Sequence, residues 1–371
     1  MRRVSMPATS SPRRKRQRVG VPRLAASLAR ARVAARVRTL ALVTLLGALT
    51  VTLAACGGHA APTSMIVYVS DDGRTYVRTS GTPRPSATQR FRIASVTKTF
   101  TATIIFQLAA EGKLRLDDTV ERYLPGVVPG GQHITIRELL GHRSGLANYT
   151  DYADWLARAG RSRSLRPIDV LRFAASQPRT FPPNSGWQYS NTNYIALGVI
   201  IERITRQSFA QELEQRILRP LGLRHTQLAT SRTLPDLHDQ GENPNVSWGT
   251  NPNLSWAAGG IVSNAPDLVR FFSALLSGRI LSRGSLTQME QTFPVGSGTI
   301  LADGLGIFST RLPFGCGLVW GHTGDILDYH TLVEASQDGS RVAVISVRGS
   351  PQPLPPDVLP RLCPGHTTKT H

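Results

Sequence analysis

Alternating apolar and polar residues predict strands near both ends of the chain. The stretches 65–70 and 74–79 flank Asp71-Asp72-Gly73, which favours a hairpin, and 90–94 reads as a third short strand. At the other end the same alternation predicts four strands, over 304–310, 318–324, 329–335 and 341–349. A sheet built from both ends of the chain is therefore expected.

Helical periodicity dominates the residues between. Ser95 to Gly112 is strongly apolar and ends at a glycine, which predicts a largely buried helix. Five further helices are predicted, over 134–146 (ending near His142), 167–176, 193–205, 211–223 and 266–278. The order favours an α+β fold in which an antiparallel sheet joins both termini, is flanked by helices and holds an inserted, mostly helical region at about 117–260.

Charge is concentrated at the start of the chain. Residues 1–55 hold 12 Lys and Arg and no acid, so the formal charge of +19 falls to +7 without them. This basic stretch ends in an apolar run over 39–55, the pattern of a secretory signal. Since the basic excess lies in that leader, we expect no nucleic-acid partner. We expect a leader over 1–55, a tether over 56–64, a folded domain over 65–350 and a Pro-rich tail over 351–371.

The three cysteines fit an extracytoplasmic protein. Leu53-Ala54-Ala55-Cys56 resembles a bacterial lipobox, which implies lipidation of Cys56 and a protein anchored to the outside of the cell membrane. An uncleaved anchor and plain secretion are the alternatives. Cys316 and Cys363 remain for one disulfide. Scattered cysteines without CxxC spacing argue against structural zinc, and no metal or organic cofactor is implied.

One short motif suggests nucleophilic catalysis. The only S-x-x-K in the chain is Ser95-Val96-Thr97-Lys98, at the start of the apolar helix. One helical turn puts Lys98 on the same face as Ser95, where a desolvated amine could activate the hydroxyl. Taken alone the motif is weak, because Ser95 could be an N-cap and Lys98 a solvated side chain. The sequence has no GxSxG, Walker or HExxH motif.

Five ordered stretches between residues 65 and 350 strengthen this hypothesis. Residues 91–126 resemble the first motif region of the serine D-Ala-D-Ala carboxypeptidases. These belong to the penicillin-recognising serine hydrolases, together with class C β-lactamases and related esterases. The other matches are 134–146 with its SGL ending, the Y-x-N motif Tyr189-Ser190-Asn191, the AGG-containing segment 255–278, and His322-Thr323-Gly324 as the HTG form of the third motif.

The resemblance implies a role for each matching residue. Ser95 would be the nucleophile, Lys98 its activating partner and Tyr189 the proton shuttle. The N–H groups of Ser95 and Asp325 would form the oxyanion hole. Asn191 would orient the substrate amide, the strand His322-Thr323-Gly324 would line the site, and Trp256 would wall the cleft.

The implied function is that of an exported serine hydrolase working through an acyl-enzyme. A D-alanyl-D-alanine carboxypeptidase or related D-amino-acid peptidase is favoured, with an esterase or class C-like β-lactamase as alternatives. A catalytically silent protein that binds peptidoglycan or β-lactams is the alternative of another class. Expected partners are a peptidoglycan-derived peptide or small ester or amide, a covalent β-lactam adduct and the membrane. The protein is expected to be a monomer.

Two departures from the family pattern change these expectations. Where close relatives carry an Arg near the substrate carboxylate, this chain has Phe308, with no Arg before Arg311. Asp325 stands where relatives commonly have a hydroxyl residue after HTG. A neutral ester, amide or capped D-peptide is therefore expected to be preferred over a substrate anion. The Pro-rich tail is not expected to extend the core, which would leave one sheet face poorly covered.

Overall fold

The computed structural model describes residues 64–230, 251–295, 301–312, 317–326, 328–350 and 355–363. The chain divides into two compact units, Met1–Leu49 and Thr50–His371, and every described residue lies in the second. The predicted leader and Cys56 therefore lie outside the described residues, as does Cys316, so lipidation and the disulfide with Cys363 stay predictions. No helix in the described part of the chain is long and apolar enough to span a membrane.

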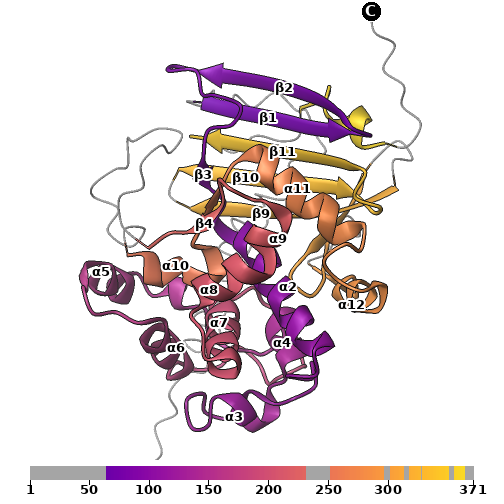
Figure 1. Cartoon of the computed structure of the whole chain (residues 1–371). Coiled ribbons are helices and arrows are strands. Elements are labelled where there is room, and N and C mark those ends of the chain that lie inside the picture. Colours follow the sequence, from indigo (N-terminus) through magenta and orange to yellow (C-terminus); the bar gives the residue numbers. More distant parts are fainter. Residues whose placement is uncertain are drawn as a thin grey trace, which may run out of the picture. The chain divides into compact units, whose positions relative to one another are not determined.

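An antiparallel eight-stranded sheet joins the two ends of the folded region, as predicted (Figure 1). Its strand order is β2-β1-β11-β10-β9-β8-β7-β6. The strands are β1 (Ser64–Asp71), β2 (Arg74–Gly81), β6 (Phe293–Pro294), β7 (Leu301–Asp303), β8 (Phe308–Leu312), β9 (Gly317–Ile326), β10 (Tyr329–Ser336) and β11 (Arg341–Arg348). The predicted hairpin is β1–β2, and β1 also pairs with β11, with Tyr68 opposite Val344.

Helices fill most of the middle of the sequence. They are α2 (Thr97–Ala110), α3 (Val120–Tyr123), α4 (Ile136–Leu140), α5 (Ala153–Arg161), α6 (Pro167–Ala175), α7 (Asn191–Thr205), α8 (Phe209–Leu213), the π-helical η4 (Glu214–Leu218), α9 (Arg219–Leu221), α10 (Pro252–Gly259), α11 (Ala265–Leu276) and α12 (Arg283–Met289). The short 3-10 helices are η1 (Ala94–Val96), η2 (Gly131–His133), η3 (Tyr149–Asp151) and η6 (Leu359–Leu362). A small second sheet, ordered β3-β5-β4, consists of β3 (Phe91–Arg92), β5 (Ile261–Ser263) and β4 (Gln227–Leu228).

Helix α2, which follows η1, is held by threonines as well as by apolar packing. The Thr97 hydroxyl accepts the backbone N–H of Ile261 at 3.1 Å. The Thr99 hydroxyl donates to Gly306 O at 2.8 Å. All these groups are buried, so each bond satisfies a backbone group that burial would otherwise leave unpaired. The helix that carries Lys98 is thus tied to both the small sheet and the segment before β8.

Both faces of the large sheet are covered around β1 and β11. In β1, Ile66 belongs to the main core, which α11 helps to cover, whereas the next residue, Val67, belongs to a second buried cluster (Figure 1). That cluster also contains Val358 and Leu362, which are at most 1% exposed. The expectation that the tail adds nothing to the core is therefore wrong, because η6 and the turn before it bury apolar side chains against this sheet face. The domain boundaries themselves stay a prediction.

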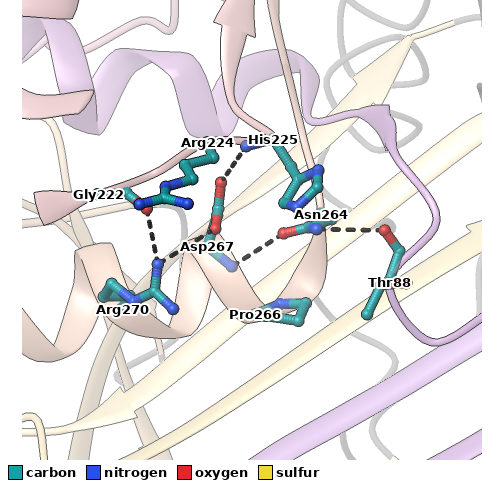
Figure 2. Close-up of a pocket in the computed structure, with 8 residues that line it drawn as sticks. All are labelled: Thr88, Gly222, Arg224, His225, Asn264, Pro266, Asp267 and Arg270. Atoms are coloured by element: carbon teal, nitrogen blue, oxygen red, sulfur yellow. Dashed lines mark hydrogen bonds and ion pairs between the residues drawn. The ribbon is translucent and has the colours of Figure 1, made fainter. Parts of the chain in front are cut away.

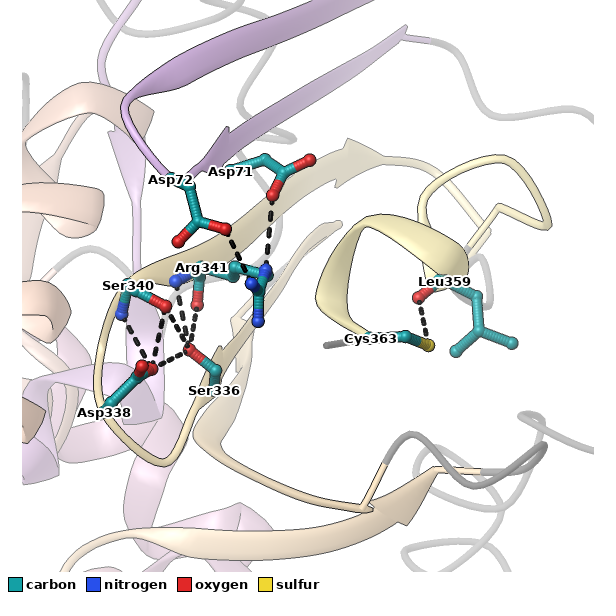
Figure 3. A network of polar contacts seen from close by, with 8 residues as sticks. All are labelled: Asp71, Asp72, Ser336, Asp338, Ser340, Arg341, Leu359 and Cys363. Atoms are coloured by element: carbon teal, nitrogen blue, oxygen red, sulfur yellow. Dashed lines mark hydrogen bonds and ion pairs between the residues drawn. The ribbon is translucent and has the colours of Figure 1, made fainter. Parts of the chain in front are cut away.

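An ion-pair network joins the turns at one end of the sheet (Figure 3). Arg341 Nη2 lies 2.6 Å from Asp72 Oδ2, and its Nε lies 3.3 Å from Asp71 Oδ1. In the β10–β11 turn, Asp338 Oδ1 accepts the backbone N–H of Ser340 at 3.0 Å. These contacts hold the β1–β2 turn against the start of β11, at the junction of the two chain ends.

We expect Leu362→Ala to lower the free energy of unfolding by about 2–5 kcal/mol, because it removes a buried side chain and leaves a cavity under the sheet. Urea unfolding followed by circular dichroism measures this change. Leu318→Ala is the matched control: Leu318 is 37% exposed on β9, and its loss should change stability by about 0.5 kcal/mol or less. Equal effects of the two substitutions would contradict the packing of the tail.

Candidate active site

Ser95 and Lys98 meet at the junction of η1 and α2. Lys98 Nζ lies 3.0 Å from Ser95 Oγ, 2.7 Å from Asn191 Oδ1 and 2.7 Å from Ala258 O. Asn191 Oδ1 and the Ala258 carbonyl can only accept hydrogen bonds. A neutral amine has two N–H donors and one lone pair, so these two acceptors take the donors and the lone pair points to the Ser95 hydroxyl. The geometry suits proton transfer from Ser95 to Lys98.

Burial sets the protonation state of Lys98. Its side chain is fully buried, and this burial lowers the pKa of the amine well below its ordinary value. The nearby Asp303 carboxyl raises the pKa, but by less. Burial thus favours the neutral amine, which is the form that can act as a general base.

Tyr189 faces the same pair from the other side. Lys98 Nζ lies 4.9 Å from the centroid of the Tyr189 ring. Burial raises the pKa of the Tyr189 phenol far above its usual value, although its hydrogen bond with Ser95 acts in the opposite direction. The phenol is thus protonated at neutral pH, and in this state it can give a proton to a leaving group.

Close backbone approach brings β9 beside the nucleophile. A Cβ atom at Gly324 would lie 2.2 Å from Ile93 O, so only glycine fits at this position. Ala94, immediately before Ser95, has φ of +45°, a strained conformation for alanine. Such strain is frequent at functional sites, and here it belongs to the turn that presents Ser95. The strand His322-Thr323-Gly324 consequently runs beside the turn that presents Ser95.

His322 provides no positive charge to the site. It is buried, and its Nδ1 lies 2.5 Å from Thr323 O, to which it donates. Burial lowers the pKa of His322 to about 3, so the ring is neutral at neutral pH. Phe308 on β8 stacks on this imidazole with ring centroids 4.4 Å apart. Arg311 is three residues along β8 and points to the opposite sheet face from Phe308, so it does not replace the missing arginine.

Two of the predicted substrate contacts have other partners in the structure. The Trp256 ring, 6% exposed, lies 5.4 Å from the ring of Phe209 and fills the space above Gly198, where a Cβ would lie 2.6 Å from it. Trp256 as a cleft wall is therefore wrong, since its side chain is part of the core. Asn191 accepts from Lys98, and its Nδ2 donates to Asn148 Oδ1 at 3.3 Å, so this amide orients the base.

Two residues near the site, His142 and Asp303, are not among the predicted site residues. His142 is buried with its ring 4.3 Å from that of Tyr189, and its Nδ1 accepts the backbone N–H of Ser190. Asp303 is 1% exposed and accepts from Trp187 Nε1 at 2.6 Å. Burial raises the pKa of Asp303 well above its usual value. The only available signal was that His142 lies in the SGL-containing segment.

A separate cavity of about 490 Å³ opens at the start of α11 (Figure 2). Arg224, His225 and Arg270 are among its lining residues, and the Asp267 carboxylate stands between them. None of the site residues described above lines this cavity. The chemistry suggested by Ser95 and Lys98 therefore belongs to a different part of the molecule.

Comparison with known proteins decides the family. The model of the beta-lactamase family matches residues 52–361. The chain belongs to this family. Its α+β fold, with an antiparallel sheet and flanking helices, agrees with that of the solved relatives, and the family identifies the chain as a serine hydrolase of the beta-lactamase and penicillin-binding protein type.

Several relatives within this group are informative. A D-stereospecific amidohydrolase from Streptomyces sp. is 32% identical, with a TM-score of 0.72 over 78% of this chain and 90% of that one. The D-amino acid amidase from Ochrobactrum anthropi SV3 is 27% identical, with a TM-score of 0.68 over 78% and 89%. Penicillin-binding protein 4* of Bacillus subtilis is 30% identical over 263 residues, 66% of this chain. This chain spans only 57% of the length of that relative and 29% of protein flp of Staphylococcus aureus.

Proposed function

We propose that this protein hydrolyses amides or peptides of D-amino acids through an acyl-enzyme on Ser95. The observation that carries the proposal is the buried Lys98 amine 3.0 Å from the Ser95 hydroxyl, with its pKa lowered by burial. The amine takes the Ser95 proton as Oγ bonds to the substrate carbonyl carbon. The protonated Tyr189 phenol then gives a proton to the leaving nitrogen as the C–N bond breaks. Water attacks the resulting ester and gives a proton to the Tyr189 phenolate, which replaces the proton that left with the nitrogen. The proton held by Lys98 returns to Ser95 Oγ as the D-amino acid is released.

The choice of D-amino-acid amides rests on the relatives and on the charge of the site. The Streptomyces and Ochrobactrum relatives are named for action on D-configured substrates, and both are covered almost over their whole length. A D-alanyl-D-alanine carboxypeptidase must accommodate a free carboxylate. The described residues around Ser95 offer it no cation, because His322 is neutral and Phe308 stands beside it. An amide without that carboxylate suits this site better.

A comparison of enantiomers tests the proposal. We expect kcat/KM for D-phenylalanine amide to exceed that for L-phenylalanine amide by about 10²-fold, because the wrong enantiomer places its side chain or amine against the wrong pocket contacts. Release of ammonia measures both rates. Equal rates for the two enantiomers would contradict the D-specific proposal, and failure to hydrolyse either amide would contradict amidase activity.

Export to the outer side of the cell membrane, with a lipid on Cys56, is part of the same proposal. It rests on the basic and apolar leader and on the sequence before Cys56. In bacteria that express the protein, we expect wild type in the membrane fraction. We expect Cys56→Ser either to appear in a soluble fraction or to accumulate as the uncleaved precursor, which is recognised by its larger mass. A wild-type protein that is found only in the soluble cell interior would contradict this expectation.

A further inference from the structure

A carboxylate, that of Asp325, follows directly after the third motif on β9. Asp325 shares a face of β9 with Thr323, and 65% of its side chain is exposed. The strand register places it opposite His330 of β10, whose Nδ1 lies 2.6 Å from Asp325 Oδ1. The imidazole thus fixes the orientation of the carboxylate and leaves it open to solvent.

This carboxylate lies within electrostatic range of the reacting groups. The negative charge of Asp325 contributes to the raised pKa of the Tyr189 phenol. This phenol is hydrogen-bonded to Ser95. The close approach of Gly324 to Ile93 fixes the neighbouring backbone beside the nucleophile. A substrate whose carbonyl is at Ser95 must therefore place one of its nearby groups in the field of Asp325.

Among the described residues, no lysine or arginine neutralises the charge of Asp325. None of the lysines and arginines described forms an ion pair with Asp325. Arg348, which pairs with Tyr329 in the sheet register, is held by Asp328 at 2.7 Å. His322 is neutral and Arg311 lies on the opposite face of β8 from Phe308, so neither supplies a positive charge to offset Asp325.

We propose that Asp325, oriented by His330, forms a subsite for a positively charged group of the substrate, such as the α-ammonium of a D-amino-acid amide. The same carboxylate repels a substrate carboxylate. This inference rests on the proposed function and adds to it the charge of the preferred substrate: D-amino-acid amides with a free amine, ahead of N-acylated amides, with peptides that end in a carboxylate last.

The experiment compares three probes at pH 7: D-phenylalanine amide (cationic), N-acetyl-D-phenylalanine amide (neutral) and N-acetyl-D-alanyl-D-alanine (anionic). In Asp325→Asn we expect the ratio of kcat/KM for the cationic probe to that for the neutral probe to fall about 5- to 100-fold. The ratio for the anionic probe to the neutral one should rise. Asp328→Asn, in the same β9–β10 turn, is the matched control and should change neither ratio.

A second measurement needs no variant. Raising the salt concentration from about 0.05 M to about 0.5 M screens exposed charges, so wild-type kcat/KM should fall for the cationic probe and rise for the anionic probe. An Asp325→Asn enzyme with unchanged ratios, or a salt effect of the opposite sign, would overturn the subsite and leave the proposed function intact. A wild-type protein inactive on all three probes would instead overturn the proposed function.

Discussion

Replacing Ser95 with alanine is expected to lower kcat/KM for D-phenylalanine amide by about 10⁴–10⁶-fold, because it removes the atom that becomes acylated. The Ser95 hydroxyl is the hydrogen-bond partner of Lys98 that can give up a proton, since Asn191 Oδ1 and Ala258 O are pure acceptors. Steady-state release of ammonia measures the loss.

The fold should survive this substitution. Ser95 is only partly buried, and the Lys98 amine keeps its bonds to Asn191 and Ala258, so the melting temperature should stay close to that of the wild type. A folded Ser95→Ala protein that keeps activity within about 10-fold of wild type would show that another group is the nucleophile.

Lys98→Met is expected to lower kcat/KM by about 10²–10⁴-fold, the usual contribution of a general base. The pH profile gives a sharper test. Activity needs the neutral amine, so in the wild type it rises with pH through the pKa of Lys98. Because burial holds that pKa well below its ordinary value, the rise is complete at a pH far below that expected for an exposed lysine. This acid limb should disappear in Lys98→Met.

The same substitution should change how the stability of the protein depends on pH. The unfolded chain binds a proton on Lys98 up to about pH 10.4, whereas the native amine releases it at lower pH. Between these two pKa values the unfolded state binds more protons, so the lysine destabilises the native state there, and its cost disappears as the pH rises through about 10.4. We therefore expect the stability of the wild type relative to Lys98→Met to rise with pH between the two pKa values and to level off above about pH 10.4.

Lys113→Met provides the control for both effects. Lys113 forms a surface ion pair with Glu111 at 2.8 Å, and 48% of its side chain is exposed. Such a pair contributes little, so activity and melting temperature should change hardly at all. A Lys98→Met enzyme with wild-type activity or an unchanged acid limb would contradict the assignment of Lys98 as the base.

Local pattern was sufficient to predict much of the fold. The β1–β2 hairpin follows from alternation around Asp72-Gly73, and the proximity of Ser95 and Lys98 follows from one helical turn. The order of elements implied the sheet that joins both ends, because strands that bury one face must pair with one another. Each of these features depends on residues close in sequence or on a repeating period.

The features that escaped prediction depend on contacts between distant segments. Asp303 is near Lys98 only because β7 packs against the segment that carries Trp187, a contact over 116 residues that no local pattern encodes. Trp256 is next to the AGG segment in sequence, but its ring turns into the core against Gly198. In the tail, proline content suggested an unpacked segment, whereas Val358 and Leu362, in its described part, are buried against the sheet.

Intact-mass spectrometry with a penicillin tests the central claim, a nucleophilic Ser95, most directly. The account predicts that wild-type protein gains the mass of one penicillin, that digestion maps the adduct to Ser95, and that Ser95→Ala gains no mass. Acylation should be slow in Lys98→Met, since the amine takes the proton of the attacking hydroxyl. An adduct that persists in Ser95→Ala, or that maps to any residue other than Ser95, would contradict the account.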